Sequence, residues 1–146
     1  MTKLLLSIHV LAAILAIGPV AVAASLFPRH LRADDAPGSG LPRFLHRTCR
    51  VYAVLGITVP VFGLATGAHL GVLTDAWLLV SIALTALAAA LLALAILPGQ
   101  QRLLTGSVPD PRRGAARLSM LTGVFNLLWA IVVVLMIVRP GSTTGA

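Results

Sequence analysis

The sequence has few charged, acidic and sulfur-containing residues, and these scarcities exclude several classes of protein. Only 10% of the 146 residues are Asp, Glu, Lys or Arg, and only four are acidic. This charge content, with 58% hydrophobic residues and a mean hydropathy of +0.99, excludes an ordinary soluble globular domain. A single cysteine, Cys49, excludes an internal disulfide and a zinc site built on paired cysteines. We interpret Cys49 as a reduced structural thiol.

Motifs of several catalytic and binding classes are also missing. The sequence contains no hydrolase triad, no phosphate-binding glycine loop and no paired catalytic carboxylates. The apolar runs hold no Asp, Glu, Lys or Arg, which argues against an ion-driven pump. The net charge of +7 does not indicate nucleic-acid binding, because the basic residues are confined to short segments outside the apolar runs.

Long apolar runs dominate what remains. Each is free of charged residues and is long enough to cross a hydrocarbon core of about 30 Å as a helix. They predict one all-α transmembrane domain over residues 1–146, an antiparallel up-down four-helix bundle with connecting loops and a disordered tail. The helices are expected at about 4–27, 51–73, 76–97 and 118–138, the loops at 28–50 and 98–117, and the tail at 140–146.

The distribution of positive charge predicts the orientation in the membrane. Nine of the eleven Lys and Arg residues lie in the loops 28–50 and 98–117. Because Lys and Arg resist translocation, both loops are expected in the cytoplasm and both termini outside. Ala21-Val22-Ala23 also fits a signal-peptidase site, but the apolar run before it exceeds the usual signal-peptide core of roughly 7 to 15 residues. We therefore favour an uncleaved first helix.

His9 is the histidine that falls clearly inside an apolar run. It shares a helix face with Ala13 and Ala16, and small residues mark packing faces in membranes, so His9 is expected to face the bundle interior. By depth it belongs to one layer with His69 and Ser81. Imidazole suits haem iron or copper, so His9 and His69 are candidate cofactor and metal ligands. Alternatively, His9 hydrogen-bonds Ser81 or a carbonyl and His69 is interfacial.

Weakly polar residues on the other runs form a second candidate feature. Thr66, Ser81 and Asn126 are expected to point into the bundle interior. With Thr58 they could line a path in a small oligomeric transporter.

Arginines and histidines also cluster at the predicted cytoplasmic boundary. Arg29, Arg47 and Arg50 are expected to contact lipid headgroups or, if a site lies between the helices, haem propionates. His30 and His46 lie among these arginines and could form a second histidine pair, but we favour the interpretation that both are solvated.

Short segments resemble one bacterial family. Residues 6–14 (Leu-Ser-Ile-His-Val-Leu-Ala-Ala-Ile) and 26–31 (Leu-Phe-Pro-Arg-His-Leu) resemble the first helix of the CopD and HemJ group of small membrane proteins. Weaker similarities lie at 66–67, 125–128 and 138–140. The resemblance implies a bacterial cytoplasmic membrane location, haem-dependent protoporphyrinogen oxidation for HemJ-type proteins, and copper for CopD-type proteins. The family's histidine falls on His9, but its following tryptophan is absent and Ser81 stands where a lysine is expected.

Three functional hypotheses follow from these features. The first is a haem b-binding protein with a redox or haem-handling role and His9 as ligand, which would be an oxidoreductase of the protoporphyrinogen-oxidase type only if haem is bound. The second is an accessory or assembly subunit of a larger membrane complex without a cofactor. The third is the small oligomeric transporter. The expected partners are the lipid bilayer and a second copy or membrane subunit, and not nucleic acid.

Overall fold

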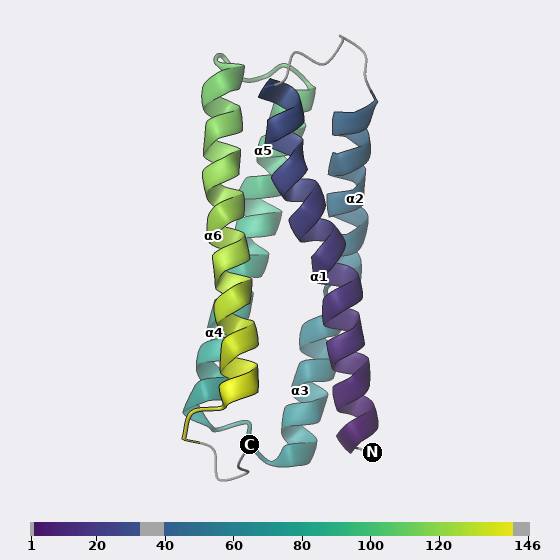
Figure 1. Ribbon diagram of the computed structural model, residues 1–146, viewed down its shortest axis with the longest axis vertical. Coiled ribbons are helices and arrows are strands. Elements are labelled where there is room, and N and C mark those ends of the chain that lie inside the picture. The colour runs from purple at the N-terminus through teal and green to yellow at the C-terminus, as the bar shows by residue number, and fades with distance from the viewer. Residues whose placement is uncertain (1, 33–39, 142–146) are drawn as a thin grey trace.

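The computed structural model describes residues 2–32 and 40–141, and every regular element in these two ranges is helical (Figure 1). The predicted loop residues 33–39 and tail residues 142–146 lie outside the described residues. The elements are α1 (Thr2–Arg32), α2 (Leu41–Leu55), α3 (Thr58–Leu70), α4 (Ala76–Leu91), the π-helix η1 (Leu92–Ile96), α5 (Leu97–Leu104) and α6 (Pro111–Val138).

The helices form four spans of membrane-crossing length. The spans contain 28 to 30 residues each and comprise Thr2–Leu31, Leu41–Leu70, Ala76–Leu104 and Pro111–Val138. At 1.5 Å per residue each is roughly 42 to 45 Å long, more than a hydrocarbon core of about 30 Å requires. The predicted count of four apolar helices is confirmed, and the architecture is that of a multi-pass membrane protein. Which terminus faces which side stays a prediction.

The helices extend further than their apolar runs. Residues 28–32, 41–50, 98–104 and 111–117 are helical, although the sequence predicts loops over 28–50 and 98–117. The prediction placed these four boundaries at Pro28, Arg50, Pro98 and Arg117. Arginine is a good helix former, and a helix that has begun in the membrane can continue into water. The connectors are therefore much shorter than predicted.

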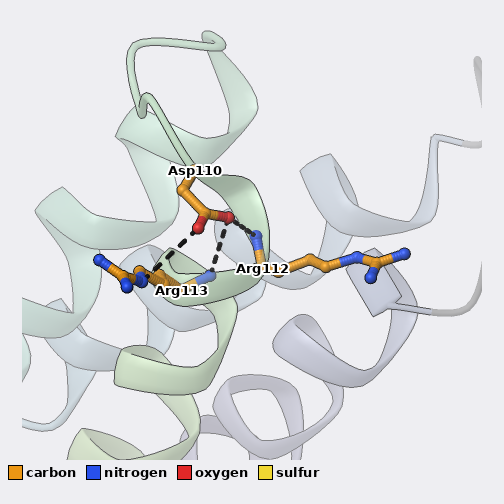
Figure 2. A network of polar contacts seen from close by, with 3 residues as sticks. All are labelled: Asp110, Arg112 and Arg113. Carbon is orange, nitrogen blue, oxygen red and sulfur yellow. Dashed lines mark hydrogen bonds and ion pairs between the residues drawn. The ribbon is translucent and has the colours of Figure 1, made fainter.

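Asp110 fixes the start of α6 (Figure 2). Its Oδ1 atom accepts hydrogen bonds from the backbone N–H groups of Arg112 at 3.1 Å and Arg113 at 3.3 Å. Pro111 follows the cap, at a position where its missing N–H is harmless. The Arg113 Nε to Asp110 Oδ2 ion pair, at 3.7 Å, is exposed and contributes little. The cap is therefore the main local reason that α6 begins here.

Removing this cap should destabilise the bundle measurably. We expect Asp110→Ala to lower the free energy of unfolding by about 1 kcal/mol, because two backbone N–H groups lose their acceptor. Thermal unfolding in detergent, followed by circular dichroism, measures the change. Asp110→Asn is the control, because its amide oxygen still caps the helix and only the exposed ion pair is lost. Equal losses in both variants would contradict this assignment.

The main buried cluster lies in the half of the bundle opposite the start of α1 and the end of α6. The start of α1 and the end of α6 lie at one end, together with α3 and the start of α4; we call this the terminal half (Figure 1). The connector half holds the end of α1, with α2, η1, α5 and the start of α6. The main buried cluster centres on Phe27, Cys49, Ile96 and Phe125 and includes α2, so it occupies mainly the connector half. Among the described residues of the terminal half, the buried cluster is the small one of Val72, Trp77 and Leu78.

Two proline residues interrupt the regular helices. Pro60 has no N–H, so it cannot bond the carbonyl of Gly56, which accepts instead from Val59 N–H at 3.1 Å. The second span accordingly breaks between Leu55 and Thr58. In the third span the π-helix η1 lies directly before Pro98, and Leu97 N–H donates to the Leu92 carbonyl, five residues back. Beyond the first break, α3 packs on α1 and barely touches α4.

Candidate functional site

A large apolar cavity lies in the terminal half, between α1, α3, α4 and α6. Its volume is about 810 Å³, within the range of roughly 300 to 1,000 Å³ that is typical of small-molecule sites. It exists because α3 and α4 barely touch, so no side chains interdigitate between them. The apolar side chains that line it include Leu6, Val10, Ala13, Ile14, Val59, Pro60, Leu64, Leu78, Ile82, Ala89, Val132, Val133, Met136 and Ile137.

His9 is the histidine that lines this cavity. Its Nδ1 atom lies 2.8 Å from the backbone carbonyl oxygen of Val59 on α3. A carbonyl oxygen only accepts, so Nδ1 is the donor and carries the ring proton. In the neutral imidazole this leaves Nε2 with a free lone pair. The same arrangement, a second ring N–H held by a carbonyl, orients histidines that ligate metals.

Gly63 makes room for this imidazole. A Cβ atom built on Gly63 would lie 2.8 Å from His9 Cε1 and 3.1 Å from His9 Nδ1, closer than side chains normally approach. The ring therefore lies against the backbone of α3. The Val59 carbonyl and the bare Gly63 backbone, one helical turn apart, together determine where the imidazole sits.

A single arginine lies at the membrane-surface end of the cavity. Arg139 lines the cavity, follows the last residue of α6 and adopts a left-handed conformation with φ of 47°. Its guanidinium carbon lies 5.6 Å from the centre of the Trp77 ring, and its Nε donates to the Met136 carbonyl at 3.2 Å. Trp77 in turn donates to Asp75 Oδ2 at 3.1 Å. These contacts hold a cation where an anionic group of a bound molecule could meet it.

Polar atoms without partners follow one face of α6 from Trp129, which lines the cavity, toward the connector half. Within residues 2–32 and 40–141, the buried side-chain atoms that lack a partner are Trp129 Nε1, Asn126 Oδ1 and Thr122 Oγ1. The Asn126 amide nitrogen donates to Ser25 Oγ at 3.3 Å. An unpartnered buried polar group costs about 1 to 3 kcal/mol, so this face of α6 is not optimised for stability.

A nearly isosteric substitution on this face of α6 should change the stability of the protein. We expect Thr122→Val to raise the free energy of unfolding by about 1 kcal/mol, because it removes a hydroxyl that has no partner. Thr66→Val is the control, since Thr66 is also buried but donates to the Phe62 carbonyl at 2.7 Å. That variant should be neutral or destabilised. Thermal unfolding measures both, and a destabilised Thr122→Val variant would contradict the geometry.

The structure does not bring His69 to His9. His69 is exposed and is not among the residues lining the cavity. His9 contacts α3 at Gly63, six residues before His69, which corresponds to roughly 9 Å along a helix. The bond from His9 to a carbonyl is one of the alternatives the sequence leaves open. That bond uses only Nδ1, so it does not occupy the nitrogen that would ligate iron.

The other predicted interior residues are buried to different degrees. Ser81 is fully buried and donates to the Trp77 carbonyl at 2.8 Å, Thr66 is buried, and Asn126 is half-buried. None of the three lines the cavity. Thr58, proposed with them for a transport path, is exposed.

The predicted boundary arginines lie far from His9. Arg29, Arg47 and Arg50 are exposed. Arg29 lies twenty residues from His9 on the same helix, which corresponds to roughly 30 Å. Arg29 is therefore remote from the cavity, whereas Arg139 lines it together with His9.

The sequence interpretation missed a buried histidine outside the cavity. His46 is 7% exposed, so the prediction that it is solvated is wrong. Its Nδ1 lies 2.9 Å from Gln100 Oε1, and the Gln100 amide donates to Cys49 Sγ at 3.6 Å. The spacing of His46 and Cys49, three residues apart, would have placed both on one face had the segment been recognised as helical. This network ties α2 to α5 in the connector half.

The ligand atoms around the cavity fit a porphyrin-bound metal better than a bare copper ion. The described residues contain no group of three or more His, Cys, Asp or Glu side chains that could hold a metal ion. A bare copper ion needs several protein ligands, whereas a porphyrin brings four nitrogens and needs only an axial ligand from the protein. His9 and the apolar walls fit the porphyrin-bound metal. Comparison with protein-family models, curated proteins and solved structures gives no match for this chain.

Proposed function

We propose that the protein binds haem b in the terminal-half cavity, with His9 as the iron ligand, and has a redox or haem-handling role. The observation that carries this proposal is the 2.8 Å bond from His9 Nδ1 to the Val59 carbonyl. It fixes the tautomer in which Nε2 is free to ligate, on a side chain that lines a ligand-sized cavity.

The residues around His9 support an amphiphilic planar ligand. The cavity walls are almost entirely aliphatic, so they would exclude water from an apolar macrocycle. Arg139, held against Trp77, would pair with a carboxylate at the membrane surface. Because His69 does not line the cavity, His9 is the histidine among the described residues that would hold the iron there. Bound haem supplies one-electron redox chemistry at its iron.

The orientation proposed from the charge distribution determines in which half of the bilayer the cavity lies. With both termini outside the bacterial cytoplasmic membrane, the cavity opens in the outer half of the bilayer and the arginine-rich connectors face the cytoplasm. The resemblance to the HemJ group makes protoporphyrinogen oxidation the first reaction to assay on the haem-loaded protein.

Titration with hemin tests the proposal. Protein purified in detergent is titrated while the Soret band is recorded in the oxidised and reduced states. We expect saturation at one haem per chain. In detergent without protein, the Soret absorbance rises in proportion to added hemin and does not saturate. The same behaviour with the protein present would overturn the proposal and leave the accessory-subunit and transporter hypotheses.

A further inference from the structure

A second, smaller concavity lies between the third and fourth spans in the connector half. We call it the α5–α6 groove; its volume is about 320 Å³, and η1, α5, the following loop and α6 contribute to it. It lies in the opposite half of the bundle from the His9 cavity and shares no lining residue with it. Its ligand can therefore be considered independently of haem binding.

Two arginines from different helices line the groove. Arg102 belongs to α5 and Arg117 to α6, and both are exposed. In the part of the chain that the structure describes, neither guanidinium forms an ion pair or a side-chain hydrogen bond. Asp110, the N-cap of α6, already accepts hydrogen bonds from the first turn of α6 and forms an ion pair with Arg113. The groove thus presents two positive charges without a compensating anion among the described residues.

The rest of the groove is apolar and lies at membrane depth. Leu94 and Ala95 of η1 and Leu121 of α6 line it, and Leu94 is 77% exposed. These residues belong to spans that are long and apolar enough to cross a hydrocarbon core, so in a bilayer this part of the groove would open toward lipid tails. A small water-soluble anion could reach the arginines but has no apolar part to place beside Leu94. An occupant that satisfies both parts has an anionic head and an acyl chain.

The walls of the groove are fixed by close helix packing. A Cβ atom on Gly99 would lie 2.9 Å from Leu118 Cδ2, and one on Gly114 would lie 2.9 Å from Leu103 Cδ2. α5 and α6 therefore interlock through a leucine seated on each glycine. The π-helix η1, just before Pro98, widens the third span immediately below this contact. The groove exists before any ligand binds, which lowers the cost of binding.

We propose that the α5–α6 groove binds an anionic phospholipid of the adjoining leaflet. Its phosphate lies between Arg102 and Arg117, and one acyl chain lies along Leu94, Ala95 and Leu121. Basic pockets between transmembrane helices recognise lipid headgroups in this way. This site differs from the headgroup contacts predicted for Arg29, Arg47 and Arg50, which lie on α1 and α2.

Native mass spectrometry of delipidated protein in a non-ionic detergent tests the proposal. Binding of the first lipid is compared for phosphatidylglycerol, which is anionic, and phosphatidylcholine, which is zwitterionic. Wild-type protein should prefer phosphatidylglycerol by about tenfold or more, given two arginines at the headgroup. In Arg102→Gln/Arg117→Gln the preference should fall below about twofold. Inorganic phosphate in excess should not displace the lipid.

Two further variants distinguish lipid binding in the groove from non-specific attraction between anionic lipid and the positive charge at this end of the bundle. Arg112→Gln/Arg113→Gln removes the same charge at the same end of the bundle but outside the groove, and should keep the wild-type preference. Leu121→Trp fills the apolar part and should weaken phosphatidylglycerol binding with both arginines intact. An unchanged preference in the Arg102/Arg117 variant, an equal loss in the Arg112/Arg113 variant, or displacement by inorganic phosphate would overturn the proposal. Circular dichroism and gel filtration verify that each variant folds.

Discussion

Gly63→Ala should weaken haem binding by about 10- to 100-fold, the loss typical when the group that orients a metal-ligating histidine is disturbed. The added methyl carbon would lie 2.8 Å from His9 Cε1 and 3.1 Å from Nδ1, so the imidazole must move. α1 and α3 are packed against each other, which limits how far the two helices can separate. The ring must then leave the Val59 carbonyl, and Nε2 loses its fixed direction. Hemin titration of the variant measures the loss.

Two other glycines supply matched controls for this substitution. A Cβ atom on Gly18 of α1 or on Gly123 of α6 would meet nothing within 4 Å. Gly18→Ala and Gly123→Ala should therefore bind hemin as the wild type does. Alanine is favoured over glycine in helices by up to about 1 kcal/mol, so both controls should also be slightly stabilised. If Gly63→Ala bound hemin as tightly as they do, the close contact between His9 and α3 would not matter for the site.

The number and approximate position of the spans could be predicted because charge is excluded from the hydrocarbon core. The charged residues all lie outside the apolar runs, because their burial in lipid would be costly. That same criterion could not locate the helix ends, because a helix does not stop where the membrane does. The residues 41–50 show the consequence: their arginines suggested a loop, although Gly40 precedes a helix that runs to Leu55.

The inward position of His9 could be predicted from its small-residue neighbours, but its partner could not. Periodicity gives the face that a residue occupies on its own helix and contains nothing about the register of another helix. The bond to Val59 depends on where α3 begins after the break near Pro60, and the close approach depends on Gly63. The prediction that His9 and His69 lie close together rested only on their similar depth in the membrane. Similar depth does not bring two side chains into contact.

The buried network in the connector half shows a similar limit. His46 and Cys49 share a helix face only if residues 41–50 are helical, and Gln100 joins them only because α5 continues past Pro98. Once both helix ends are known, the burial of these residues follows from their spacing.

His9→Ala should have the largest effect on haem binding, because it removes the nitrogen that would ligate the iron. Val59 lies inside α3, where the Gly63 N–H is the regular helical donor to its carbonyl, so the variant should still fold. Affinity for hemin should fall at least about 100-fold, as loss of a ligand exceeds disturbance of its orienting group. Added imidazole should restore part of the binding, since the truncation leaves space for a free ring in the cavity.

The most direct test of the central claim is therefore the absorption spectrum of hemin-saturated wild type, His9→Ala and His69→Ala, recorded side by side in the oxidised and reduced states. The account predicts a protein-bound Soret band in the wild type and in His69→Ala, and its loss in His9→Ala unless imidazole is supplied. A band that survives in His9→Ala without imidazole, or that disappears in His69→Ala, would contradict the assignment of His9 as the iron ligand.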